Sequence, residues 1–166
     1  YLNAFKKALI LNNNITTTGR LDYGIYLYSQ SNSTNITGNQ ISTSATLTDT
    51  INVRDSSLNI INGNNITTSG NSAIGIYFRN SGSNNITSNN LTTSGVSVYG
   101  IYMEGALSSS SKIQSNYIEM NGGSSRAIYL YDGVKSTGIL GNTIVAKGSS
   151  SYSIYTYSNI NYTIIN

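Results

Sequence analysis

The chain has 166 residues, of which 24 are Asn, 27 are Ser and 18 are Thr, and it contains no Cys, His, Pro or Trp. Nine basic and six acidic side chains give a net charge of +3, without the basic cluster that a nucleic-acid interface needs. The absence of Cys and His excludes disulfides, thiolate metal sites and imidazole bases. No apolar run approaches the ~20 residues of a membrane-spanning helix.

The first eleven residues allow two interpretations. Residues 1–2 align with residues 26–27, one repeat further along, so the segment fits part of a strand. Alternatively, Leu2, Phe5 and Leu9 have helical spacing, which fits an amphipathic capping helix. The sequence does not decide between the two.

From residue 13 onward the tripeptide Asn-x-Ile, once with Leu in place of Ile, recurs six times at intervals of 25 to 27 residues. Self-similarity at this period marks a chain of stacked units, each of which buries its apolar face against its neighbours. The polar composition alone is typical of disorder, but 38% of the residues are hydrophobic and they keep register with the repeat. The six Asn residues are Asn13, Asn39, Asn64, Asn89, Asn116 and Asn142.

Each unit contains three short apolar segments. In the longest, residues alternate with a period of two, as in residues 25–28, which predicts a strand with one buried face. The positions in line with Tyr26 and Tyr28 admit Arg54 and Glu104 in other units, so the Ile and Leu columns should face inward and the Tyr columns outward. The isoleucine column of this segment is Ile25, Ile51, Ile76, Ile101, Ile128 and Ile154.

The other two segments flank a tight turn at the repeated Asn. Asn tolerates the left-handed backbone that such a corner needs, and its amide can bond to the Asn one coil away. We therefore expect the six Asn residues to form a structural ladder. Thr43, Thr68 and Thr93 should be semi-polar interior residues of the segment after the turn. The isoleucine column before the turn is Ile10, Ile36, Ile61, Ile86, Ile113 and Ile139, with Ile164 as its last member.

Three strands per coil of 25–26 residues, with one tight corner and two variable loops, describe an all-β, single-stranded parallel β-helix of six to seven coils. A helical-repeat solenoid is excluded because its units would need ten or more residues of 3.6 periodicity, which the Asn, Ser, Thr and β-branched residues oppose. We interpret residues 1–166 as one β-helix domain, either a segment of a longer solenoid or a unit of a filament.

The run Gly-Ile-Tyr-Leu followed by Asn-Ile-Thr-x-Asn-x-Ile resembles the right-handed parallel β-helix repeat of the pectate-lyase-like superfamily. Residues 24–41, 75–91 and 100–118 carry the resemblance best, and it extends over nearly the whole chain. The resemblance implies a right-handed coil. The richness in Asn, Ser, Thr and Tyr is similar to adhesin-like surface proteins of methanogenic archaea and to related bacterial repeat proteins. Enzymes, adhesins and fibres share this repeat, so it is specific for fold and weak for function.

Enzymes of the superfamily act through clustered carboxylates, often with a basic residue or calcium. Of the six acids here, only Glu104 and Asp132 are expected near each other, a spacing that can suit a retaining glycosidase. The competing interpretation is a surface charge ladder formed with Arg54 and Arg79, which we favour. We therefore expect no catalytic residue, cofactor or metal site. The six acids are Asp22, Asp49, Asp55, Glu104, Glu119 and Asp132.

A stripe of tyrosines is the strongest surface feature. It can stack on sugar rings or pack against another rod, since Tyr combines apolar area with a polar tip. Alternatively, the rings stack along the helix and stabilise it. The candidate contact stripe comprises Tyr26, Tyr77, Tyr102, Tyr129, Tyr155, Tyr28, Tyr131 and Tyr157.

Seven Asn-x-Ser/Thr sequons are candidate N-glycosylation sites and fit an exterior protein, although a chain this rich in Asn, Ser and Thr produces sequons by chance. They lie at Asn14, Asn32, Asn35, Asn65, Asn85, Asn90 and Asn161.

These features predict an extracellular or cell-surface rod with a structural or adhesin-like, non-enzymatic role. The expected partners are further β-helix coils or other copies stacked end to end, and glycans or cell-surface polymers; nucleic acid and membrane insertion are not expected in this segment. One alternative is a polysaccharide lyase, hydrolase or epimerase whose catalytic coils lie outside this segment. Another is a self-assembling fibre with no ligand.

Overall fold

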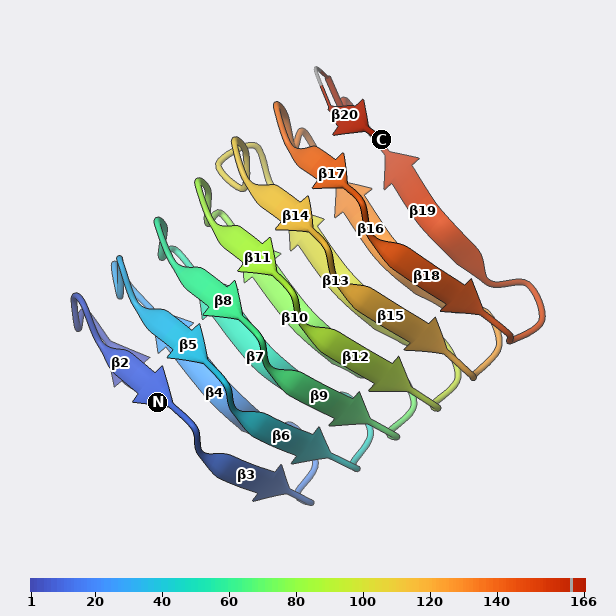
Figure 1. Cartoon of the computed structure of the whole chain (residues 1–166), viewed down its shortest axis with the longest axis horizontal. Helices are drawn as coiled ribbons and strands as arrows, with labels where there is room; N and C mark the ends of the chain where they lie inside the picture. Colours follow the sequence, from blue (N-terminus) through green and yellow to red (C-terminus); the bar gives the residue numbers. More distant parts are fainter. Residues whose placement is uncertain (162) are drawn as a thin grey trace.

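The computed structural model describes residues 1–161 and 163–166, and within them it forms three parallel β-sheets and no helix (Figure 1). Sheet A contains β1 (Leu2–Asn3), β4 (Tyr23–Tyr28), β7 (Asp49–Arg54), β10 (Ile74–Arg79), β13 (Tyr99–Glu104), β16 (Arg126–Tyr131) and β19 (Tyr152–Tyr157). Sheet B contains β2 (Leu9–Leu11), β5 (Asn35–Thr37), β8 (Ile60–Asn62), β11 (Asn85–Thr87), β14 (Lys112–Gln114), β17 (Gly138–Leu140) and β20 (Ile164–Ile165). Sheet C contains β3 (Asn14–Thr17), β6 (Gln40–Thr43), β9 (Asn65–Thr68), β12 (Asn90–Thr93), β15 (Tyr117–Met120) and β18 (Thr143–Ala146).

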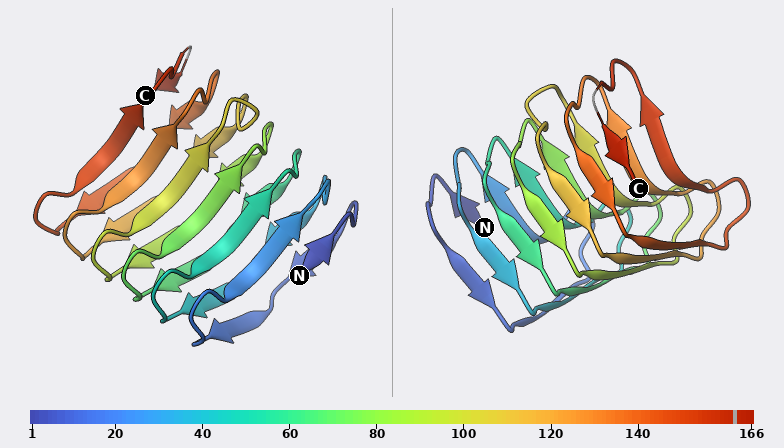
Figure 2. Two further views of the ribbon diagram at one scale, coloured as in Figure 1. Left: turned by 180° about the vertical axis from the view of Figure 1, so that it is seen from behind. Right: turned by 45° about the horizontal axis from the view of Figure 1, so that its top comes forward.

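Each strand pairs in parallel with its equivalents in the neighbouring coils, so the chain winds as a β-helix (Figure 2). Over the described residues, six complete coils run from β2 to β19, flanked by β1 and β20. This confirms the predicted solenoid of six to seven coils.

The two ends of the chain separate the competing predictions. Leu2 pairs with Leu27, so the start of the chain is a strand and the capping-helix interpretation is wrong. At the other end Ile139 pairs with Ile165, so the prediction that Ile164 ends the isoleucine column is also wrong. The last interval of that column is one residue longer than we assumed.

The core lies between the three sheets and is built from the predicted columns. The isoleucine column of each sheet is buried in the internal coils, together with larger residues such as Phe78 and Met103. Thr43, Thr68 and Thr93 are also buried, and the hydroxyl of Thr43 lies 2.8 Å from that of Thr50. The terminal coils are more exposed because each stacks on one neighbour only.

Sheet A departs from strict alternation at one position per strand. A Cβ placed on Gly75 would lie 3.1 Å from Leu91 Cδ2, so this position points into the core, as does the next residue, Ile76. Ala127, at the same position two coils later, in β16, is likewise a core residue. Two consecutive inward residues reverse the alternation for the residue that precedes them. Ile74 therefore faces outward, on the same side of the sheet as Tyr77 and Arg79.

The tight corner between sheets B and C carries the Asn ladder. Asn64 Oδ1 accepts bonds from the backbone N and from Nδ2 of Asn39, both at 2.9 Å. Asn64 Nδ2 in turn donates to Ile36 O and to Asn89 Oδ1, both at 2.9 Å. The amide thus joins three coils, and it is buried and fully bonded.

The left-handed residue of this corner is not the ladder Asn, as we expected, but the residue before it. Gly63, for example, has φ of +62° and Ser88 has φ of +55°. None of the ladder Asn residues has positive φ, and their side chains turn inward and bond along the stack. All six preceding residues have positive φ: Asn12, Gly38, Gly63, Ser88, Ser115 and Gly141.

Further ladders of Ser and Asn side chains, which we did not predict, lie at the other corners. Backbone N of Ser31 bonds to Ser56 Oγ at 3.0 Å, and backbone N of Ser56 bonds to Ser81 Oγ at 3.1 Å. Backbone N of Asn59 bonds in the same way to Asn84 Oδ1 at 2.9 Å. Small polar side chains therefore satisfy the buried amides of the turns, which explains the high Ser and Asn content.

Nothing in the described part of the chain forms a helix that is long and apolar enough to cross a membrane.

Candidate functional site

The outer surface of sheet A, which we call the tyrosine face, consists of three columns of side chains. The first column was not predicted; its members are Tyr23, Asp49, Ile74, Tyr99, Arg126 and Tyr152. The second contains Tyr26, Asn52, Tyr77, Tyr102, Tyr129 and Tyr155. The third contains Tyr28, Arg54, Arg79, Glu104, Tyr131 and Tyr157.

Rings of the tyrosine face pack on one another along the axis. Tyr102 stacks on Tyr129 with centroids 4.8 Å apart and planes 9° apart, and on Tyr77 with centroids 5.3 Å apart. Tyr155 contacts Tyr129 edge-on at 5.3 Å. Both faces of the central rings are thus covered by protein, so these rings present edges and not faces to solvent.

Two arginines complete the packing. Arg126 lies over several rings, the nearest being Tyr155, whose centroid is 4.6 Å from the guanidinium carbon. Arg54 stands where Asn52 interrupts the second column, 5.9 Å from the Tyr26 ring and 5.3 Å from the Tyr77 ring. A guanidinium there substitutes for the missing ring, in cation–π contact on both sides.

This packing changes the candidate contact stripe. Tyr77, which we placed on the outward face, does point outward but is only 6% exposed. Its neighbour Asn52 is completely buried because the longer side chains beside it cover it. The stripe residues that expose most surface are Tyr28 and Tyr157, and Tyr152 of the unpredicted first column is 50% exposed.

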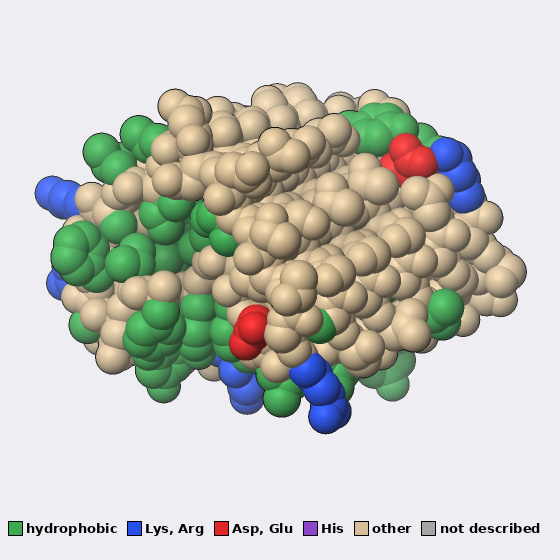
Figure 3. Space-filling view, turned by 90° about the horizontal axis from the view of Figure 1, so that it is seen from below, with side chains coloured by type: hydrophobic (Ala, Val, Ile, Leu, Met, Phe, Trp, Pro, Cys, Tyr) green, Lys and Arg blue, Asp and Glu red, His purple; other side chains and the backbone are tan. Residues whose placement is uncertain are grey.

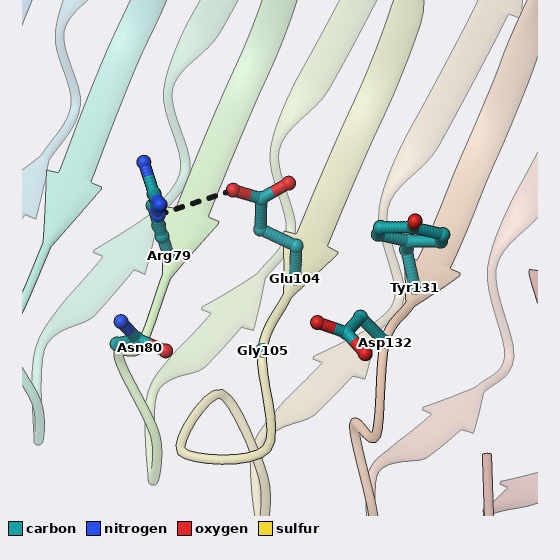
Figure 4. Close-up of a pocket in the computed structure, with 6 residues that line it drawn as sticks. All are labelled: Arg79, Asn80, Glu104, Gly105, Tyr131 and Asp132. Atoms are coloured by element: carbon teal, nitrogen blue, oxygen red, sulfur yellow. Dashed lines mark ion pairs between the residues drawn. The ribbon is translucent and has the colours of Figure 1, made fainter. Parts of the chain in front are cut away.

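A surface hollow of about 430 Å³ lies at the ends of β10, β13 and β16 (Figure 4). Arg79, Glu104 and Tyr131 project into it from the strand ends, and Asp132 reaches it from the following turn. Glu104 and Asp132 therefore share one hollow, as the sequence predicted. The charge column of Arg54, Arg79 and Glu104 also has the predicted register.

Glu104 is held by its neighbours. Arg79 Nε lies 3.3 Å from Glu104 Oε1, the hydroxyl of Tyr77 donates to Oε1 at 2.5 Å, and that of Tyr102 donates to Oε2 at 2.6 Å. Burial raises the pKa of Tyr77 and of Tyr102, and the hydrogen bonds to Glu104 and its charge raise both further. Both phenols therefore stay protonated and donate to the carboxylate. The three contacts hold the Glu104 side chain in one position and occupy both of its oxygens.

A second, shallower hollow of about 290 Å³ lies over the buried carboxylate of Asp49, between Tyr23 and Ile74. Asn52 Nδ2 donates to Asp49 Oδ2 at 2.5 Å, and Arg54 Nε donates to Asn52 Oδ1 at 3.1 Å. Burial raises the pKa of Asp49 from 3.8 to about 6, against the opposing effects of the Asn52 bond and the Arg54 charge.

The raised pKa predicts a pH-dependent stability. In the folded protein Asp49 holds its proton up to about pH 6, whereas in the unfolded chain it loses the proton near pH 4. The free energy of unfolding should therefore fall by about 2 to 3 kcal/mol, through this residue, as the pH rises from 4 to 6. Chemical denaturation at a series of pH values, with Asp49→Asn for comparison, measures the effect. The difference between the two curves isolates Asp49 from the other carboxylates, and a constant difference from pH 4 to 7 would contradict the assignment.

The sequons lie on the exterior of sheets B and C and their turns. Asn14, Asn65, Asn90 and Asn161 are exposed, whereas Asn32, Asn35 and Asn85 are partly buried. Asn65 and Asn90 pair in register, and Asn90 Nδ2 lies 3.4 Å from Asn65 Oδ1. Strands of one sheet are ~4.8 Å apart, too close for a glycan on each.

The rest of the surface is mostly polar. On the face seen from below Figure 1, most of the surface is backbone and uncharged polar or glycine residues, and hydrophobic side chains gather toward the N-terminal coil (Figure 3). Leu9 and Leu11, in β2, are exposed there. Within residues 1–161 and 163–166, no three Asp or Glu side chains gather closely enough to hold a metal ion.

The sequence did contain a signal for the missed first column. Tyr23, Tyr99 and Tyr152 follow the same intervals as the second column, but strict alternation assigns them to the core. Asp49 and Arg126 at equivalent positions contradict an interior placement, because unpaired charges are rarely buried. The residue after each first-column position is small, as at Gly100 and Ala127. A charged residue followed by a small one therefore indicates that the first faces outward and that the next two both face inward.

Comparison with known protein families adds one finding. The family described as "Right handed beta helix region" matches residues 1–166, the whole length of the chain. No curated protein matches the chain.

Proposed function

Because the chain belongs to the family of proteins with a right-handed β-helix region, with the hand that the resemblance implied, we propose that it is a structural or adhesin-like component of a cell surface. It acts outside the cell as a stiff rod segment without enzymatic activity. Its partners are glycans or surface polymers, and further β-helix coils or copies end to end. Each contact is weak, and affinity comes from repetition along the rod.

The observation that carries this proposal is the internal packing of the tyrosine face. Rings and arginines pack on one another and hold one another in place, so the face needs little ordering on binding. The exposed rings of Tyr152 and Tyr157 lie at its margin and offer apolar area with a polar tip. Sugar rings and flat polymer chains fit such a surface.

The contacts of Glu104 support a non-enzymatic role. Two phenols and a guanidinium fix its carboxylate, and Asp132 beside it lies on an exposed turn. The exposed sequons and the Asn, Ser and Thr exterior fit a location outside the cell.

The proposal is tested by glycan-array binding of the chain as a monomer and as a tetramer tethered through a terminal tag. We expect binding by the tetramer only, because single contacts are weak. Tyr152→Ser combined with Tyr157→Ser should reduce it at least about tenfold, the loss expected for roughly 1.4 kcal/mol of contact energy.

Tyr77→Phe is the matched control. It removes one hydroxyl from a buried ring, so binding by the tetramer should not change. Undiminished binding by the variant that lacks both exposed tyrosines would contradict the proposed surface.

A further inference from the structure

Eight tyrosines form one connected cluster on the tyrosine face. From Tyr157 the rings lead through Tyr131, Tyr129 and Tyr102 to Tyr77, with successive centroids 5.9, 5.8, 4.8 and 5.3 Å apart. A second branch leads from Tyr152 through Tyr155 to Tyr129, with both centroid separations 5.3 Å. Tyr99 contacts Tyr102 and Tyr129 and completes the cluster.

The cluster runs from solvent to a buried end. Tyr157 is 56% exposed and Tyr152 is 50% exposed, whereas Tyr77 is only 6% exposed. A second group, made of Tyr1, Tyr23, Tyr26 and Tyr28, lies on the other side of Arg54, and no ring of this group contacts the larger cluster within the described residues.

The buried end carries a proton acceptor. Tyr77 and Tyr102 donate their phenolic protons to the two oxygens of one carboxylate, Glu104. A phenol that loses an electron becomes a strong acid. Its oxidation is therefore easiest where its hydroxyl already donates a hydrogen bond to a base that can take the proton. The rings toward Tyr157 and Tyr152 have no carboxylate bonded to their hydroxyls among the described residues.

We propose that the cluster is a relay that moves an oxidising equivalent from the exposed tyrosines to a tyrosyl radical beside Glu104. An external one-electron oxidant, such as the high-valent haem of a peroxidase, takes one electron from Tyr157 or Tyr152, whose phenolic proton passes to water. Each ring of the cluster then gives one electron to the oxidised ring before it. The exposed tyrosine takes its proton back from water, and each intermediate ring ends as the neutral phenol that it was at the start. In the last step Tyr102 gives up the electron, and its proton passes to Glu104 Oε2.

The net change balances. One phenol and one carboxylate become a neutral tyrosyl radical and a carboxylic acid, and the oxidant gains one electron. Since the single carboxylate accepts one proton, either Tyr77 or Tyr102 holds the radical by this route, not both. Tyr77 is the better shielded of the two rings, at 6% exposure, so a radical held there is kept from coupling with other molecules.

Flash photo-oxidation with a ruthenium trisbipyridine sensitiser and persulfate tests the relay on the full chain. We expect a long-lived tyrosyl radical by transient absorption and electron paramagnetic resonance, and slower formation in deuterated water because the last step transfers a proton. Glu104→Gln keeps a hydrogen-bond acceptor but cannot take the proton. It should lower the yield of the long-lived radical several-fold and remove the isotope effect.

Two further variants keep the result interpretable. The double change Tyr77→Phe and Tyr102→Phe preserves the stacked rings but removes both phenols, so it should cause the same loss even if Glu104→Gln destabilises the fold. Tyr28→Phe lies in the separate group and should leave the yield of the long-lived radical unchanged. A long-lived radical of normal yield and isotope effect in Glu104→Gln, or in the double variant, would overturn the proposal.

Discussion

Replacing Asn64 with alanine is expected to destabilise the protein by about 3 to 5 kcal/mol. The change removes an acceptor for the backbone N and Nδ2 of Asn39, and a donor to Ile36 O and Asn89 Oδ1. These groups are buried, and water cannot replace the lost partners without opening the corner. The free energy of unfolding, from urea denaturation followed by circular dichroism, measures the effect.

Asn13→Ala is the matched control at the end of the same ladder. Asn13 is exposed, and its side chain only donates, to Leu11 O and to Asn39 Oδ1. Its loss should cost less than about 1 kcal/mol because Asn39 Oδ1 keeps its bond from the backbone N of residue 13 and the bond to Leu11 O is exposed. If the two variants were equally stable, the ladder would not be a main source of stability.

Gly95→Ala is expected to lower the free energy of unfolding by at least about 3 kcal/mol, because of a steric overlap and not because of a lost hydrogen bond. Gly95 belongs to a column in which the turns of neighbouring coils touch backbone to backbone. A Cβ on Gly95 would overlap the carbonyl group of Gly70, which cannot move without separating the coils. The same contact recurs along the column, where a Cβ on Gly70 would overlap the carbonyl group of Ala45 and one on Gly122 that of Gly95.

Gly63→Ser distinguishes this overlap from a general need for glycine in turns. Gly63 has positive φ, but a Cβ there would meet no atom within 4 Å. Serine occupies the equivalent corner position at Ser88 and Ser115 with φ of +55° and +54°. The variant should therefore lose no more than about 1 kcal/mol in denaturation experiments, and a loss as large as that of Gly95→Ala would refute the close-approach explanation.

Much of the fold could be predicted because each structural position occurs in six successive repeats. One Asn-x-Ile tripeptide says little, whereas six in register locate the corner, and charges such as Arg54 and Glu104 identify the outer face of sheet A. A substitution that is allowed in one coil constrains the same position in every coil, because the coils share one geometry.

The errors arose where local geometry departs from the simplest rule. Strict alternation missed the two inward residues at Gly75 and Ile76, and with them Tyr99 and Tyr152. The propensity of Asn predicts that it takes the left-handed position, whereas the ladder Asn residues bond along the stack and the residue before each has the positive φ. Propensity indicates what a residue tolerates, and its hydrogen bonds decide where it is needed.

The position of the candidate site could be predicted, but the contacts between its side chains could not. The sequence placed Tyr77 and Tyr102 on one outward column and Glu104 on the next. It could not show that both phenols bind the one carboxylate, or that Arg54 covers the gap at Asn52. Those contacts depend on side-chain conformations that only the packed face determines, and they make a catalytic role for Glu104 the weaker proposal.

The most direct test of the proposed non-enzymatic role is polysaccharide turnover by the purified chain. Neutral and acidic polysaccharides would be incubated with the protein and with Glu104→Gln, and released reducing ends and unsaturated products measured over time. We expect the two proteins to give the same signal as buffer alone. Turnover by the unchanged protein that Glu104→Gln abolishes would contradict the account and make the hollow at Glu104 and Asp132 an active site.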